Sequence, residues 1–192
     1  MPFNMPDINT KKYSFGPGRV FLGAPGETPS KDVGSVRSGA ELTVTRERLE
    51  VYQGSPRTLV KQYVTNETAQ LVVTGIEWDL ELIAQAIGYD PNVAVGGTSG
   101  LTITLGLGGD MDVSQVALRF QHVTPVGATI MIDFFKAEGS GEFKNTFGDE
   151  LHEFPYTFKA IAATCGWAGV SDILDAKKSL LRMIYIKAPS EA

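Results

Sequence analysis

The sequence contains one cysteine, Cys165, which excludes both an intramolecular disulfide framework and a cysteine-rich metal site. Cys165 lies among small residues in "AIAATCGWAG", a setting typical of a buried and unreactive thiol. Apolar runs are also short. None approaches the ~20 residues that a membrane-spanning helix needs, and "MPFNMPDINTKKYSFGPG" lacks the apolar stretch of a secretory signal. We therefore expect no membrane insertion, and synthesis in a cytoplasm.

Clusters of basic residues are absent as well. The net charge is −5, and positive and negative side chains are spread evenly along the chain. A tight nucleic-acid binder needs grouped Lys and Arg to displace counterions from phosphates. The sequence therefore argues against a specific complex with DNA or RNA.

Histidine is scarce, which limits acid–base and nucleophilic catalysis to His122 and His152. His122 continues the apolar face of a predicted strand, as a boundary residue would. His152 stands beside Asp149, Glu150 and Glu153 in "FGDELHEF". Such a group can hold a metal ion, but three carboxylates and one histidine in a turn, without zinc-type spacing, are more typical of a solvated loop. We predict that the chain is not an enzyme.

Other ligand-binding motifs are incomplete. Asp110 and Asp112 in "GGDMDVS" resemble part of a calcium loop, but the glycine and glutamate that an EF-hand requires do not follow. Trp78 and Trp167 are expected to pack in the interior and not to form sugar-binding platforms. We predict no metal and no cofactor.

What the sequence does contain is period-2 alternation of apolar and polar residues, which predicts a mainly β fold. In "TIMIDFF", for example, Ile132 and Phe134 alternate with Asp133 and Phe135. Glycine and proline separate the segments, as in "GAPGETPS" and "EGSGE". The predicted strands lie in "RVFLG", "ELTVT", "AQLVVT", "LTITLGL", "VALRFQHV", "TIMIDFF", "FPYTFKAIAA" and "LLRMIYIKA".

One segment has helical spacing instead. In "GIEWDLELIAQAIG", apolar residues recur at Leu80, Ile83, Ala84 and Ile87, and acidic residues occupy the first turns. This predicts a helix over about residues 77–87, stopped by Gly88. A short helix in "VSDILDAKK" and a polar connection there are equally compatible with the pattern.

No composition change divides the chain, so residues 1–192 are expected to form a single domain with an N-terminal arm over residues 1–18. Residues 52–68 stand out between two predicted strands, Leu42–Tyr52 and Ala69–Thr74. The segment is too long for an ordinary structureless loop, and its apolar and polar residues alternate. We interpret it as an extended hairpin or loop that contacts a partner, because free strand edges are usually blunted or used.

The order "YSFGPGRVFLG", "DVGSVRSGAELTVTRERLEVYQG" and "ETAQLVVTGIEWDLELIAQAIG" resembles a phage major tail tube protein, and "FGDELHEFPYTFKAIA" followed by "RMIYI" is consistent with that family. The resemblance covers roughly residues 13–187 and points to the long-tailed, non-contractile type. It implies a β-sandwich or barrel flanked by one helix, with a long loop that reaches the next ring. On that basis the contact residues are expected to be Tyr52, Arg57, Lys61 and Tyr63.

The resemblance also implies a function. The chain would be a structural subunit of the virion tail, assembling as stacked hexameric rings into a hollow conduit for double-stranded DNA delivery. Its partners would be copies of itself, a tape-measure protein and the tail-terminator and tail-tip proteins, with DNA in transit and not specifically bound. An acidic chain suits a conduit that must not hold phosphates. The alternative is a monomeric β-sandwich module that binds carbohydrate or protein.

Overall fold

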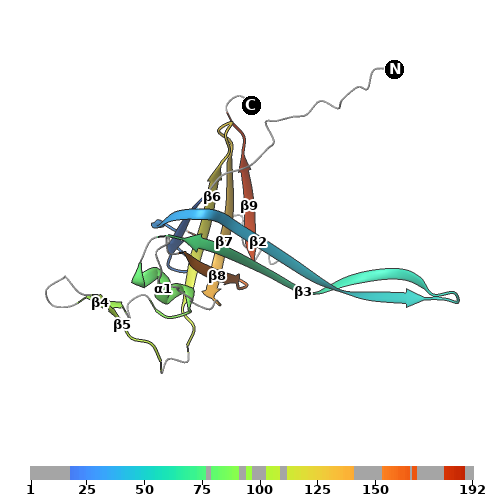
Figure 1. The fold of residues 1–192 in the computed structure, drawn as a ribbon. Coiled ribbons are helices and arrows are strands. Elements are labelled where there is room, and N and C mark those ends of the chain that lie inside the picture. Colours follow the sequence, from blue (N-terminus) through green and yellow to red (C-terminus); the bar gives the residue numbers. More distant parts are fainter. Residues whose placement is uncertain are drawn as a thin grey trace, which may run out of the picture.

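The computed structural model describes residues 18–76, 79–90, 94–96, 103–108, 112–140, 153–164, 166–167 and 180–188. The predicted mainly β fold with one helix is confirmed (Figure 1). The elements are β1 (Arg19–Gly23), β2 (Lys31–Gln53), β3 (Thr58–Gly75), α1 (Leu80–Ala86), β4 (Ala94–Gly96), β5 (Ile103–Leu105), β6 (Gln115–Val123), β7 (Thr129–Gly139), β8 (Phe154–Ala160) and β9 (Leu181–Ile186).

Seven strands form one antiparallel sheet in the order β6-β1-β2-β3-β8-β7-β9, and β4 and β5 form a separate pair. Strand β7 pairs with β6 along one edge, and its other edge is shared by β9 and, over three residue pairs, by β8. The sheet therefore curls back on itself around the core without closing completely.

The core lies inside this curl and follows the predicted alternation. Leu71, Leu118 and Phe134 are completely shielded from solvent, and Val73 and Phe158 nearly so. Each belongs to the inward set of its strand, with more polar neighbours facing the other way. Alternating apolar side chains thus put one face of every central strand on a common interior.

Helix α1 covers one end of this core and begins later than the sequence predicted. Asp79 is the N-cap: its backbone is extended, and its side chain accepts hydrogen bonds from the backbone N–H groups of Glu81 and Leu82 at 2.9 and 3.2 Å. A residue that caps in this way stands outside the helix, so the first turn starts at Leu80. The predicted stop is confirmed at Gly88, whose φ of +89° suits glycine.

The helix sits very close to the sheet. A Cβ atom on Gly139 of β7 would lie 2.2 Å from the carbonyl oxygen of Gln85 and 2.4 Å from that of Ala86. Only glycine allows this approach of helix backbone to strand backbone.

Several predictions concern residues outside the described ranges: the arm over residues 1–17, the segment 170–178, Trp78, Asp110, Cys165 and the cluster around His152. The predicted strand in "RVFLG" is confirmed as β1. The predicted extended hairpin is confirmed, but the predicted start of its second strand at Ala69 is wrong. Residues 58–68 do not connect two strands but are the first part of β3 itself, because β2 extends far enough to pair with them.

Candidate assembly surface on the β2–β3 hairpin

Strands β2 and β3 leave the body together and project as a two-stranded ribbon (Figure 1). We call residues 43–68 the distal hairpin. Its side chains are exposed except for the partly covered Thr68, whereas Ala69, next along β3, is completely buried. The turn at the tip, residues 54–57, begins at Gly54 with a φ of +91°. The same ladder of backbone hydrogen bonds therefore runs from the core into solvent.

The register divides the distal hairpin into two faces. Residues directly opposite each other in an antiparallel pair point to the same side. Leu49 pairs with Tyr63, and Val51 pairs with Lys61, so these four side chains share one side, which we call the apolar face. Leu49, Val51 and Tyr63 are 57, 40 and 49% exposed. The Lys61 ammonium lies 4.6 Å from the centre of the Tyr63 ring, which adds a positive charge to this face.

The opposite face, which we call the polar face, carries polar contacts within the chain, and the exposed Val64 and Leu59 lie among them. Arg46 forms an ion pair with Glu67, with 3.1 Å between nitrogen and oxygen. Nearer the tip, the Gln62 side chain accepts a hydrogen bond from Arg48 at 3.2 Å and donates one to Glu50 at 2.9 Å. Because these cross-strand contacts are exposed, each adds only a few tenths of a kcal/mol up to about 1 kcal/mol. Together they hold the two strands in register.

The four predicted contact residues are thus separated by the register. Lys61 and Tyr63 lie together on the apolar face. Tyr52 lies on the polar face, where its hydroxyl donates a hydrogen bond to Glu50, and that bond together with the carboxylate charge raises the pKa of the Tyr52 hydroxyl. Arg57 lies in the turn at the tip.

Leu49 and Val51, which complete the apolar face, are not among the contact residues expected from the sequence. They belong to the predicted strand Leu42–Tyr52, outside the segment of residues 52–68. Their apolar alternation was visible, but only the pairing of Leu49 with Tyr63 places them on the same side as the selected residues.

A second exposed apolar surface lies at the margin of the sheet that β9 forms. Strand β9 is last in the strand order, and within the described part of the chain one of its edges pairs with no other strand. Met183, Tyr185 and Ile186 on β9 are 57, 50 and 48% exposed, and Val123 at the end of β6 is 55% exposed. Such an edge is a template for pairing with another strand.

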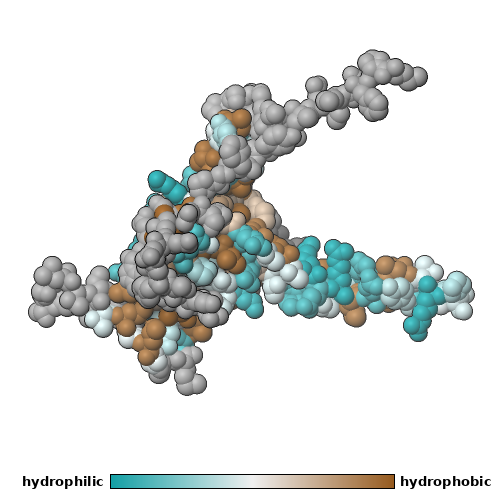
Figure 2. All heavy atoms as spheres, in the orientation of Figure 1, coloured by the Kyte–Doolittle hydropathy of each residue, from teal (hydrophilic) through white to brown (hydrophobic). Residues whose placement is uncertain are grey.

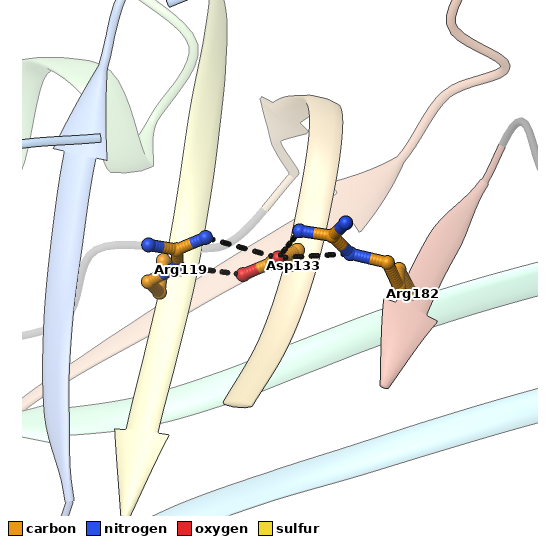
Figure 3. A network of polar contacts seen from close by, with 3 residues as sticks. All are labelled: Arg119, Asp133 and Arg182. Carbon is orange, nitrogen blue, oxygen red and sulfur yellow. Dashed lines mark hydrogen bonds and ion pairs between the residues drawn. The ribbon is translucent and has the colours of Figure 1, made fainter. Parts of the chain in front are cut away.

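The body also holds a buried ionic group that the sequence did not reveal. Asp133 is completely buried on the face of β7 opposite the core, and it binds Arg119 of β6 and Arg182 of β9 (Figure 3). Arg119 contacts both carboxylate oxygens, at 2.8 and 3.1 Å, and Arg182 contacts one of them at 2.6 Å. The three strands are neighbours in the sheet, so the group links β9 to the body.

Aromatic rings complete this outer layer. Phe135 and Trp167 meet edge to face with centroids 5.2 Å apart, and the Arg119 guanidinium lies 4.8 Å from the Trp167 ring centre. Trp167 is 2% exposed, so the prediction that it packs in the interior is confirmed. The arginines therefore hold the carboxylate from two sides, and the rings shield it.

The titratable residues named in the sequence analysis do not gather in the described ranges. His122 is buried in β6, and those ranges bring no three His, Cys, Asp or Glu side chains together. In the same part of the chain no helix has the length and apolar content to cross a bilayer. The distal hairpin, with its exposed apolar side chains, is the candidate functional surface.

Comparison with known proteins adds no identification. No family model matches the chain, and no curated protein matches it.

Proposed function

We propose that this chain is a structural subunit of a phage tail tube, of the long-tailed, non-contractile type, and that copies assemble as hexameric rings stacked into a hollow conduit for double-stranded DNA. The observation that carries the proposal is the distal hairpin, a ribbon that leaves the body and exposes apolar side chains on a regular ladder. The order of segments that resembles major tail tube proteins supplies the identity of the assembly.

Physical reasoning supports a use in assembly. On a monomer, Leu49, Val51 and Tyr63 remain exposed to water, which is less favourable than burial of their apolar surface. Exposed apolar side chains grouped in this way are typical of an interaction site. Burial against another copy would recover that free energy. Stacked rings require two different contacts, one that closes by rotation and one that repeats along the axis. The distal hairpin and the exposed β9 margin offer two separate surfaces for them.

The acidic character of the chain supports the conduit. A wall with net negative charge repels DNA phosphates and lets the polymer pass. In this proposal the chain has no chemistry of its own, and it meets a tape-measure protein before DNA and the tail-terminator and tail-tip proteins at the ends of the tube.

Electron microscopy and light scattering of the concentrated protein test the proposal, with a variant that shortens the hairpin. Replacing residues 48–65 by Asn-Gly joins Glu47 and Asn66, which already face each other, through a two-residue turn. We expect rings or tubes from the full chain and loss of stacking in the shortened one, with unchanged thermal unfolding of the body.

A matched control keeps the hairpin at full length and replaces Glu50 by Gln on the polar face, which should leave assembly intact. Protein that stays monomeric even with tail-tip components, and that binds a glycan, would contradict the proposal and support the monomeric binding module.

A further inference from the structure

We propose that the tip of the distal hairpin docks head-to-tail on an acidic and apolar patch beside helix α1 of a second copy of this chain. The proposal deepens the tail tube assignment by naming the two surfaces of one contact, and it rests on that assignment only in taking a second copy as the partner.

The tip differs in charge from the rest of the chain. Residues 51–64 contain Arg57 and Lys61 and no acidic residue. The whole chain carries −5, so without these two positive charges the rest carries −7. Lys61 stands over Tyr63 next to Leu49 and Val51, so the positive charge sits on the apolar face. A partner for this surface must combine negative charge with exposed apolar side chains.

The chain itself presents such a surface. Four exposed residues form what we call the acceptor patch: Asp90, Leu107, Asp112 and Val113. Leu107 is 61% exposed and Val113 is 49% exposed. The patch thus offers two carboxylates and two aliphatic side chains, against two cations and three apolar side chains on the hairpin.

Two hydrogen bonds bring these residues together although they come from separate segments. The backbone N–H of Ser114 donates to the carbonyl of Gly88 at 2.7 Å, which fixes Val113 against the end of α1. The Tyr89 hydroxyl accepts from the backbone N–H of Gly108 at 3.1 Å, which holds Leu107 near the same turn. Both bonds tie the patch to the residues just after α1.

The positions of the two surfaces make the contact open-ended. Helix α1 and β5 lie on the side of the body away from the hairpin, and Figure 2 shows brown, apolar residues gathered at that end. When copies stack in the same orientation, a tip at one end and a patch at the other leave one tip and one patch unpaired in every pair. The contact then repeats from copy to copy, as a contact between stacked rings must.

Charge exchange between the two surfaces tests the proposal. The tip variant carries Arg57→Glu and Lys61→Glu, and the patch variant carries Asp90→Lys and Asp112→Lys. Alone, each puts like charges in contact, and we expect self-association by sedimentation to weaken by on the order of tenfold or more. An equimolar mixture makes every tip complementary to a patch on the other variant, and association should return to the wild-type level.

The control is Lys159→Glu with Arg19→Glu, which makes the same change in net charge as the tip variant at exposed positions of the body. It should associate like the wild type, whereas equal weakening would attribute the effect to overall charge and overturn the proposal. A mixture of the tip and patch variants that stays as weak as its components would overturn it too.

A second measurement uses the unmodified chain and does not depend on how the variants fold. Mixed unlabelled and ¹⁵N-labelled protein, treated with a zero-length carbodiimide cross-linker, should join Lys61 of one copy to Asp90 or Asp112 of the other. Cross-links from Lys61 only to other carboxylates, or protein that remains monomeric, would contradict the proposal.

The two assignments fail differently. Tubes whose Lys61 cross-links map away from the acceptor patch would leave the tail tube proposal standing and remove this contact. Open head-to-tail chains with the expected cross-link, but without rings, would support this contact and contradict the tail tube proposal.

Discussion

The two halves of the β2–β3 ladder are built alike and have different surroundings. Near the body, Leu42 pairs with Leu71, and the Leu71 side chain is completely buried. Toward the tip, Leu49 pairs with Tyr63 in the same antiparallel ladder, and both are about half exposed. Backbone pairing therefore continues beyond the hydrophobic core.

The stability of the two halves has different origins. The proximal half is stabilised by apolar burial, at roughly 25 cal/mol per Å² removed from water. The distal half has cross-strand contacts that contribute only a few tenths of a kcal/mol to about 1 kcal/mol each. An isolated two-stranded ribbon is only marginally stable in water. The stability of the distal half therefore depends on the parts of β2 and β3 that pack on the core, or on a partner.

Hydrogen exchange should show the largest difference between the halves. Amides paired around Leu71 should open only with global unfolding, on the order of 5–15 kcal/mol, whereas those around Tyr63 should open locally at a much smaller free energy. Exchange measured by mass spectrometry on dilute protein checks this. Equal protection of both halves in a monomer would show that the ribbon is stable by itself, and protection of the tip that rises with concentration would report docking.

Removing the acidic partner should lower the free energy of unfolding much more at a buried ionic contact than at an exposed one. Asp133→Ala leaves Arg119 and Arg182 without their shared carboxylate, and we expect a loss of about 3–5 kcal/mol in the free energy of unfolding. Glu67→Ala breaks an exposed pair with Arg46 on the distal hairpin and should cost about 1 kcal/mol or less. Urea denaturation measures both. Similar losses would mean that the buried group contributes no more than a surface pair.

Leucine truncation makes the same comparison for apolar contacts. Leu71→Ala removes a completely buried side chain and should cost about 2–5 kcal/mol. Leu59→Ala acts on the same strand, where the side chain is 43% exposed in the free chain, and should cost about 0.5 kcal/mol. Thermal or urea unfolding of the two variants checks the difference. A large cost for Leu59→Ala in monomeric protein would show packing at the tip within one chain.

A smaller effect should appear at high pH, from a tyrosine in the body. Burial, and to a lesser extent the charge of Asp79, raises the pKa of Tyr156 above its usual value near 10. Above that pH the unfolded chain releases the Tyr156 proton while the folded chain keeps it. Stability should then fall as pH rises, by at most about 1.4 kcal/mol per pH unit from this group.

Tyr156→Phe removes this contribution. Urea denaturation at several values from pH 9 to 11 should give a shallower decline for the variant than for the wild type. Parallel curves would contradict the assignment of the slope to Tyr156.

Much of this fold could be read from the sequence because strand periodicity is local. The inward sets containing Leu71, Leu118 and Phe158 followed from alternation alone, and the helix followed from the spacing of Ile83 and Ala84. The helix starts at Leu80 and not near residue 77 as predicted. Acidic residues are favourable both as N-caps and in the first turn, so they do not show at which residue a helix begins. The length of β3 was missed because polar strand residues such as Lys61 and Gln62 look the same as loop residues until their partner strand is known.

The candidate surface was half predictable for a related reason. Tyr63 and Lys61 were expected as contact residues from the resemblance, whereas Leu49 and Val51 belong to the predicted strand Leu42–Tyr52. Whether two residues share a face across a hairpin depends on register, and the bulges between β2 and β3 shift that register at two points within the distal hairpin. Nothing in a single strand's alternation reports such a shift.

The sequence by itself determined the β class, the inward face of each central strand and the end of the helix, because these depend on residues within a few positions of one another. Only the tertiary structure decided that Asp133 is buried between two arginines, that Leu49 and Tyr63 lie together, and that Val113 meets the end of α1. Those outcomes depend on pairing and packing between segments far apart along the chain, whose geometry no local pattern encodes.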